Sequence, residues 1–177
     1  MSMKVNSSKP EKVNVLNIKL DGRTSATWAA PLDDWASGFA RMATGTDLPP
    51  DIAAAAKRLF DAATSHPHLV AGTDQLDTLV MEAFGGRVMQ KGGAEGVQCG
   101  AIRDKGWGYA LKCDDGNMAA SQVMVANLLL SLASPDAAQQ TVLNRFASQT
   151  VRNVRGFDVG TLAGTDAMRA VSIARAG

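Results

Sequence analysis

The residues with the clearest chemical potential form one short run, Lys91-Gly92-Gly93-Ala94-Glu95-Gly96, in which a lysine precedes glycines and a carboxylate. Segments typical of β-strands lie on both sides, at residues 87–90 and 97–103. Glycine has no Cβ, so the backbone N–H groups of such a run can come close to a ligand or to a second chain. The run is therefore a candidate amide- or anion-binding edge, although a tight turn within a sheet uses the same glycines.

The two charged side chains of this run have a functional and a structural interpretation. Lys91 can orient a substrate carboxylate and raise the acidity of neighbouring hydroxyls through its charge, or it can be a solvent-facing lysine at a strand end. Glu95 can fix Lys91 or bind the α-amino group of a substrate through a charge-assisted hydrogen bond, or it can be an exposed loop carboxylate.

Further blocks stand in a fixed order around this run, and together they resemble a known family. The blocks are His66-Pro67-His68-Leu69-Val70-Ala71-Gly72, Asp77-Thr78 and Lys112-Cys113-Asp114-Asp115-Gly116-Asn117, with Asp21-Gly22 and Pro31-Leu32 upstream and Asn153-x-x-Gly156-x-x-Val159-Gly160 downstream. Their order and spacing resemble the asparaginase II family, the amidohydrolases similar to the inducible rhizobial asparaginase. The resemblance covers roughly residues 20–162 and corresponds to the C-terminal half of the family's length.

This resemblance implies a fold akin to serine β-lactamases and glutaminases, in which a Ser-x-x-Lys serine attacks and a Lys-[Ser/Thr]-Gly strand lines the site. Lys91 would then be catalytic, and Gly92, Gly93 and Glu95 would bind substrate. No serine of this chain begins a Ser-x-x-Lys sequence. We expect an L-asparaginase ancestry, with hydrolysis of asparagine to aspartate and ammonia, and an isolated chain that is inactive because it lacks the attacking serine.

We expect no metal and no other cofactor. The family's Asp-Gly is usually followed by a cysteine that is a zinc ligand in the rhizobial type, but Arg23 follows Asp21-Gly22 here, and a guanidinium cannot ligate zinc. His66 and His68 could serve a metal, yet no third ligand is near in sequence, so we interpret His66-Pro67 as a helix end and His68 as partly exposed.

The acidic block at residues 112–117 lacks the ligand spacing of an EF-hand. It predicts a strand end, an Asp-Gly turn and Asn117 as the N-cap of a following helix.

Composition excludes several classes of protein. The chain has 177 residues, 46% of them apolar and 20% charged, with a net charge of +1, which is ordinary for a globular domain and does not favour a nucleic-acid or membrane partner. Cys99 and Cys113 fall in predicted strands and should be small buried hydrophobes. Residues 1–12 lack the apolar region of a signal peptide, and the apolar stretch at 123–133 is too short to span a bilayer, so we expect a cytoplasmic protein.

The expected architecture is α+β, an antiparallel sheet flanked by helices. A flexible lead (1–12) precedes a half domain (13–162) and a tail (163–177). Within the domain we expect a strand at 13–20, helices at 31–44, 50–64 and 74–84, a three-strand block at 87–113, helices at 118–132 and 137–148, and a short strand within 151–162 at the sheet edge. The inward residues predicted for the first two helices are Leu32, Trp35, Phe39 and Met42, then Ile52, Ala56, Leu59 and Ala63.

A second hypothesis is a non-catalytic binding or self-association module, or one half of a split enzyme. Half of a two-part fold leaves a large apolar surface uncovered, and such a surface demands a partner. The partner would be a second copy of the chain or an N-terminal half supplied in trans, and the small-molecule ligand would be an amide such as asparagine.

Overall fold

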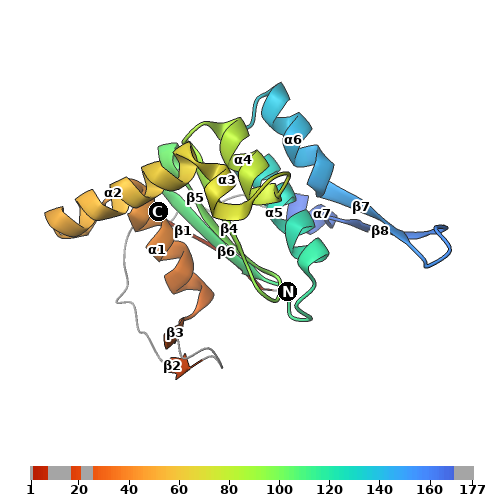
Figure 1. Cartoon of the computed structure of the whole chain (residues 1–177), viewed down its shortest axis with the longest axis horizontal. Coiled ribbons are helices and arrows are strands. Elements are labelled where there is room, and N and C mark those ends of the chain that lie inside the picture. The colour runs from red at the N-terminus through yellow and green to blue at the C-terminus, as the bar shows by residue number, and fades with distance from the viewer. Residues whose placement is uncertain (1, 8–16, 21–25, 170–177) are drawn as a thin grey trace.

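The computed structural model describes residues 2–7, 17–20 and 26–169, and a four-stranded antiparallel sheet lies at its centre (Figure 1). The strand order is β1-β6-β5-β4, with β1 at Ser2–Ser7, β4 at Val88–Gly93, β5 at Val97–Ile102 and β6 at Trp107–Lys112. A 3₁₀ turn at Arg103–Lys105 followed by Gly106, whose φ is +64°, joins β5 to β6. Strand β4 therefore forms one border of the sheet.

Helices cover both faces of this sheet. Helix α1 (Leu32–Thr44) lies on one face, where glycine allows a close approach: a Cβ at Gly108 of β6 would lie 1.9 Å from the carbonyl oxygen of Ala36. Helix α5 (Met118–Leu132) covers the other face and packs against α6 (Ala137–Ala147), and α4 (Leu76–Phe84) packs against β4 and α6. The predicted α+β class, a sheet flanked by helices, is confirmed.

The main core lies between the sheet and the helices α4, α5 and α6. Strand periodicity sends alternate residues to opposite faces, so Tyr109 and Leu111 of β6 enter this core while Ala110 faces α1. The helices contribute buried aliphatic and aromatic side chains, namely Leu76, Val80, Phe84, Val125, Leu128, Leu129 and Leu143. Helix α5 is apolar on most sides and is buried over most of its circumference.

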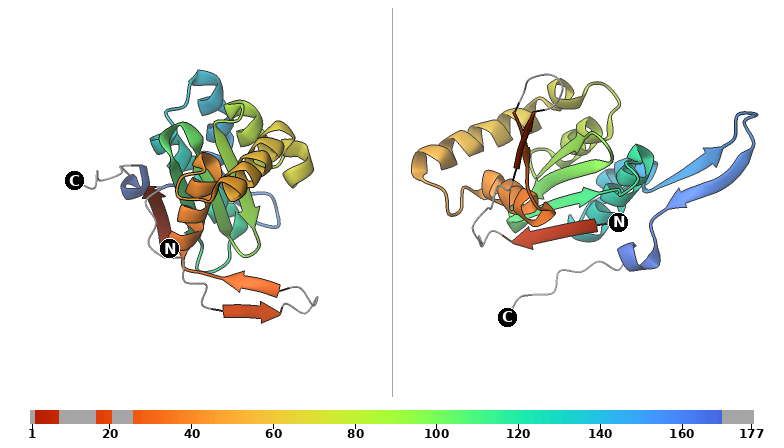
Figure 2. Two further views of the ribbon diagram at one scale, coloured as in Figure 1. Left: turned by 90° about the vertical axis from the view of Figure 1, so that its left-hand side faces the viewer. Right: turned by 90° about the horizontal axis from the view of Figure 1, so that it is seen from below.

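Smaller elements surround this body. Helix α2 (Pro50–Ser65) and the short helix α3 (Pro67–Ala71) precede α4, and β2 (Asn17–Leu20) pairs with β3 (Ala26–Ala29). Strands β7 (Ser148–Arg152) and β8 (Asp158–Ala163) form a hairpin that projects from the body, and α7 (Asp166–Arg169) follows it (Figure 2).

Several expectations about the chain ends and the last strands differ from the structure. Residues 2–7 form a strand paired with β6. The polar composition of this segment does not prevent pairing, because an antiparallel ladder is held by backbone N–H and C=O groups and not by side chains. The segment 151–162 pairs as its own hairpin instead of joining the main sheet. Met168 of the predicted tail is 4% exposed and packs in the main core. Of the strand predicted at 13–20, only 17–20 are described.

The boundaries of α1, α2 and α5 agree with prediction. The predicted inward faces agree in part: Leu32, Phe39, Met42 and Ala63 pack against the core, whereas Trp35, Ile52 and Leu59 are exposed. Trp35 is 42% exposed, and the residues of α1 that face the sheet are small, Ala36, Ser37 and Ala40, because the glycine-containing strand below admits a close helix. On α2 the C-terminal turns reach the core through Phe60, Ala63 and Thr64, and Ile52 and Leu59 are exposed.

Candidate functional site

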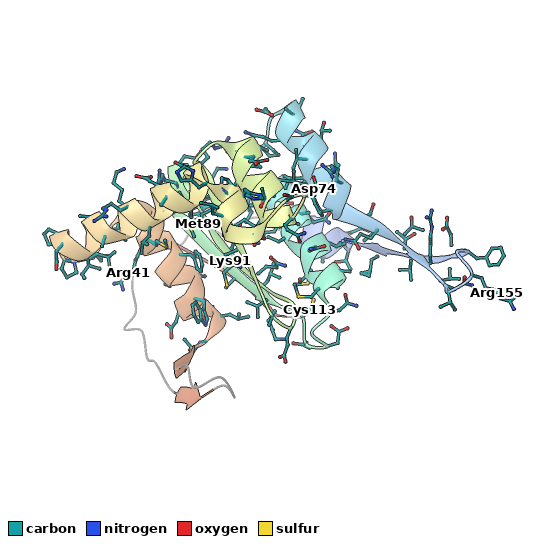
Figure 3. The ribbon with its side chains drawn as sticks, viewed as in Figure 1. Arg41, Asp74, Met89, Lys91, Cys113 and Arg155 are labelled. Carbon is teal, nitrogen blue, oxygen red and sulfur yellow. The ribbon has the colours of Figure 1, made fainter. Side chains whose placement is uncertain are left out.

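The Lys-Gly-Gly run lies within β4, at the border of the sheet and not inside the core (Figure 3). Lys91 pairs in register with Cys99 of β5, and the turn formed by Ala94, Glu95 and Gly96 connects the two strands. The Lys91 side chain is 46% exposed, and its Nζ donates a hydrogen bond to the carbonyl of Gly92. Lys91 is thus an accessible lysine on the border strand of the sheet.

Asp77, on the first turn of α4, is the carboxylate that meets this lysine. Its Oδ2 lies 3.8 Å from Lys91 Nζ and accepts a 2.7 Å hydrogen bond from the Gly92 N–H. The Asp77 side chain is only 10% exposed. The Gly92 N–H, which points away from the sheet, is therefore already bonded to Asp77. A ligand beside Gly92 would contact the Lys91 ammonium and not that N–H.

Glycine at position 92 lets two polar side chains lie close to the strand. A Cβ there would lie 3.3 Å from Gln98 Oε1, slightly tighter than ordinary contact, and 3.4 Å from Asp77 Oδ2, at the limit of ordinary contact. The missing side chain therefore leaves room for two polar groups of the protein itself beside the strand, whereas the sequence-based prediction was the approach of a ligand or a second chain.

A chain of buried polar side chains supports the site from inside the protein. Gln90 donates through Nε2 to Gln98 Oε1 at 2.6 Å and to Asp77 Oδ1 at 3.3 Å. Gln98 in turn donates to Ser121 Oγ at 3.0 Å, and Tyr109 donates its hydroxyl proton to Gln90 Oε1 at 2.7 Å. Since buried polar groups are costly unless paired, this chain fixes the position of the Asp77 carboxylate.

The electrostatics of this region follow from burial. Burial raises the pKa of the Cys99 thiol to about 11, so Cys99 is a neutral thiol at neutral pH. Burial, followed by the Asp77 carboxylate and Cys99, raises the pKa of Tyr109 well above 10.0. Both groups therefore remain protonated donors and do not act as nucleophiles or bases at neutral pH.

A cleft of about 290 Å³ opens beside Lys91. Its walls come from α3, α4, β4, β5 and α5, and its lining consists of Val70, Ala71, Gln75, Leu76, Asp77, Lys91, Gly92, Gly93, Gln98, Met118 and Gln122. The cleft combines one ammonium, one carboxylate and three side-chain amides. Among these described lining residues none carries a hydroxyl or thiol, so the lining can bind and orient a small polar molecule but contains no side chain for covalent attack.

Of the four predicted site residues, the cleft brings together Lys91, Gly92 and Gly93. Glu95 lies in the exposed turn beyond them, with φ at +55°, and is not part of the lining. Its backbone carbonyl accepts a 2.6 Å hydrogen bond from Lys112 Nζ. The carboxylate beside Lys91 is therefore that of Asp77 instead of Glu95.

The other motifs take the structural roles that the sequence predicted. Asn117 caps α5 by accepting a 2.9 Å hydrogen bond from the Ala120 N–H, after a turn at Gly116. His66 ends α2, and His68 lies 3.4 Å from the Thr73 hydroxyl, in an exposed position. Arg23, on which the expectation of no zinc depends, is outside the described residues.

Comparison with known families gives a match over almost the whole chain. The family model described as L-asparaginase II matches residues 2–163. The chain belongs to the L-asparaginase II family. A search of curated proteins gives no significant match. An asparaginase-like function follows from membership of this family, and its amide substrates are the class of molecule to consider for the Lys91 cleft.

Sequence reasoning missed the polar chain that supports the Lys91 cleft. Gln90 and Gln98 occur in strand segments that are otherwise apolar or small, and a glutamine at such a position is a usable signal because it must find a buried partner.

In the part of the chain that the structure describes, no helix has the length and apolar character needed to cross a membrane.

Proposed function

We propose that the Lys91 cleft is the substrate-carboxylate side of an L-asparaginase site. The observation that carries this proposal is Lys91 Nζ at the open border of β4, held 3.8 Å from the buried Asp77 carboxylate and facing a cleft lined by amides. Lys91 would bind the α-carboxylate of asparagine, and Gly92 and Gly93 would let the substrate lie against the strand. Glu95, at the adjoining turn, would approach the α-amino group from outside the cleft.

Hydrolysis needs an attacking group that the cleft lining does not supply. In the Ser-x-x-Lys amidohydrolases a serine attacks the amide carbon, an acyl-enzyme forms as ammonia leaves, and water releases the acid. The 177-residue sequence has no Ser-x-x-Lys. We therefore propose that this polypeptide binds the amide but becomes hydrolytic only together with a polypeptide that carries that serine, and that it works in the cytoplasm, where its two free thiols would stay reduced.

An assay of ammonia release from L-asparagine tests this proposal. The purified chain should release no ammonia above the buffer rate, and co-expression with a Ser-x-x-Lys half of the family should produce activity. Lys91→Ala should abolish that activity, whereas Lys57→Ala, at an exposed position on α2, should leave it unchanged. Rapid ammonia release by the chain alone would refute the need for a second polypeptide.

A binding measurement tests the role of Lys91 separately from catalysis. L-Aspartate, the expected product, should bind the wild-type chain by NMR titration and bind Lys91→Ala at least tenfold more weakly, about 1.4 kcal/mol. Lys57→Ala is again the control. Equal affinity of all three proteins would show that Lys91 does not hold the carboxylate.

A second candidate function, a non-catalytic self-association module, is favoured by a different observation. The β7–β8 hairpin exposes Val154, Phe157 and Val159 to solvent at 108%, 64% and 59%. Apolar groups in such a position are typical of an interaction surface.

A further inference from the structure

The hairpin formed by β7 and β8 projects from the body of the protein (Figures 1 and 2). Within the described chain, its two strands pair with each other and with no other strand. Both outer edges therefore present unpaired backbone groups, and an isolated two-stranded hairpin is only marginally stable in water. This hairpin, residues 148–163, is called the arm below.

The arm exposes its apolar residues near its outer end. Val154 and Phe157 lie in the loop that joins the strands, with Val151 just before it and Val159 just after it, and all four are more than 40% exposed. A cationic group lies among them: Arg155 is in the same loop (Figure 3), whereas Arg152 is paired with Asp158 at 2.8 Å. The tip of the arm is thus apolar and positively charged.

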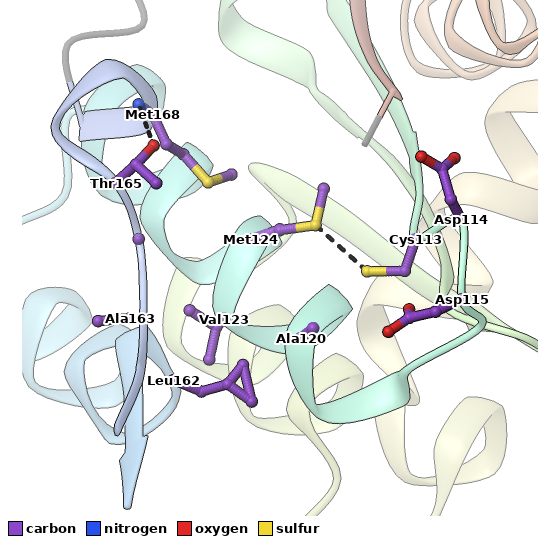
Figure 4. A pocket seen from close by; sticks show the side chains of 11 residues that line it. Cys113, Asp114, Asp115, Ala120, Val123, Met124, Leu162, Ala163, Thr165 and Met168 are labelled. Carbon is purple, nitrogen blue, oxygen red and sulfur yellow. Dashed lines mark hydrogen bonds between the residues drawn. The ribbon is translucent and has the colours of Figure 1, made fainter. Parts of the chain in front are cut away.

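A pocket of about 350 Å³ lies at the other end of the arm, at its root (Figure 4). Leu162 and Ala163 of β8 form one wall, and α5 and α7 contribute Val123, Met124 and Met168. The pocket lining is thus mainly apolar on the sides formed by the arm and the helices.

Acidic residues from the turn after β6 form the remaining side of this pocket. Asp114 and Asp115 both belong to the lining. Lys112 Nζ donates to the carbonyls of Glu95 and Cys113, and Asp115 Oδ1 accepts a 3.0 Å hydrogen bond from the Asn117 N–H. The pocket therefore has the chemistry complementary to the tip, which is apolar and cationic.

We propose that the arm docks on a second copy of this chain, with each tip in the root pocket of the other copy. Two arms related by a two-fold axis run antiparallel, and each tip then comes to lie beside the other root. The six residues of β8 span roughly 20 Å, which sets the distance between tip and root. Phe157 fills the apolar part of the pocket and Arg155 meets Asp115, twice per dimer.

This arrangement is a closed, isologous dimer, since the same surface of each copy makes both halves of the contact. It also covers the exposed arm edges, because the two arms lie side by side. The proposal rests on the arm and its root pocket and not on the hydrolytic function, so the Lys91 variants do not test it.

Sedimentation velocity of the full chain over a range of concentrations measures this association. We expect a reversible dimer, and Phe157→Ala should raise its dissociation constant about thirtyfold, as for the central residue of an interface. Leu69→Ala is the matched control, because Leu69 is 82% exposed on α3, away from the arm. Circular dichroism should show all three proteins equally folded.

Cross-linking tests the position of the tip. A mixture of the Arg155→Cys and Asp115→Cys variants should form a disulfide-linked heterodimer under mild oxidation, whereas Arg155→Cys mixed with Asp104→Cys should not. All variants carry Cys113→Ser, because Cys113 lines the root pocket, and Cys99 is buried in the sheet.

Three results would overturn the proposal. The first is a chain that stays monomeric at every concentration, and the second is equal dimerisation of Phe157→Ala and Leu69→Ala. The third is association that requires an added Ser-x-x-Lys polypeptide, which would assign the arm to a different partner.

Discussion

Replacement of Asp77 tests whether the buried carboxylate holds the border strand in place. Asp77→Ala removes the acceptor of the Gly92 N–H bond at 2.7 Å, and the loss of a hydrogen bond to a charged group costs about 1.5–3 kcal/mol. The ion pair with Lys91, at 3.8 Å and with a lysine 46% exposed, adds at most about 1 kcal/mol. The lost Gln90–Asp77 hydrogen bond adds little to this free-energy cost, because Gln90 keeps its hydrogen bond to Gln98.

The expected loss of folding free energy for Asp77→Ala is therefore about 3 kcal/mol, equivalent to a decrease in Tm of roughly 6–12 °C for a chain of this size. Asp77→Asn keeps an oxygen acceptor but loses the charge, so it should cost about 1 kcal/mol. Asp104→Asn is a control, because Asp104 is a 46% exposed partner of Arg87 at 3.4 Å and should cost less than about 0.5 kcal/mol.

Urea unfolding followed by circular dichroism measures these differences, provided that the m-values agree among the variants. A free energy of unfolding for Asp77→Ala within about 0.5 kcal/mol of the wild-type value would refute the reasoning, because Gly92 would then have an equally good partner without the carboxylate.

Three further predictions concern the rest of the fold. Gly108→Ala should prevent stable packing of α1, whereas Gly38→Ala, with open space around it, should be neutral or stabilising by about 0.5–1 kcal/mol, as thermal unfolding would show. The pKa values of Cys99 and Tyr109 are raised in the folded protein, so with rising pH these groups lose their protons in the unfolded chain before they do in the folded one. The free energy of unfolding should therefore be constant below about pH 9 and fall above it by up to about 1.4 kcal/mol per pH unit for each group. Denaturant unfolding at increasing pH checks this, and tyrosinate absorbance reports Tyr109 alone because the sequence has one tyrosine. Asp136→Ala should cost about 1 kcal/mol by removing the capping box of α6, measured by urea unfolding; no change would contradict the role of that cap.

Helix limits were predictable because local chemistry sets them. Asn117 begins α5 and accepts the expected capping hydrogen bond, and Gly45 ends α1 with φ at +73°. These features depend on neighbours in sequence, so no knowledge of the fold is needed. The Lys91 border strand was predictable for the same reason, since glycines between apolar segments indicate a hairpin.

Which side of each helix is buried was less predictable. Periodicity assigned Trp35 to the core, yet Ala36 and Ala40 face the sheet, because Gly108 leaves room for a close helix and not for a large side chain. The surface that a helix meets is set by residues remote in sequence, and a helical period alone does not identify it.

The sequence by itself determined the family, the α+β class and the lysine-glycine border, because these are recorded in the order and spacing of residues along the chain. Only the tertiary structure decided that Asp77 and not Glu95 meets Lys91, that glutamines support this pair from the core, and that the last two strands leave the sheet as an arm. The physical reason is that hydrogen-bond partners across elements depend on strand register and helix position, which packing of the whole chain fixes together.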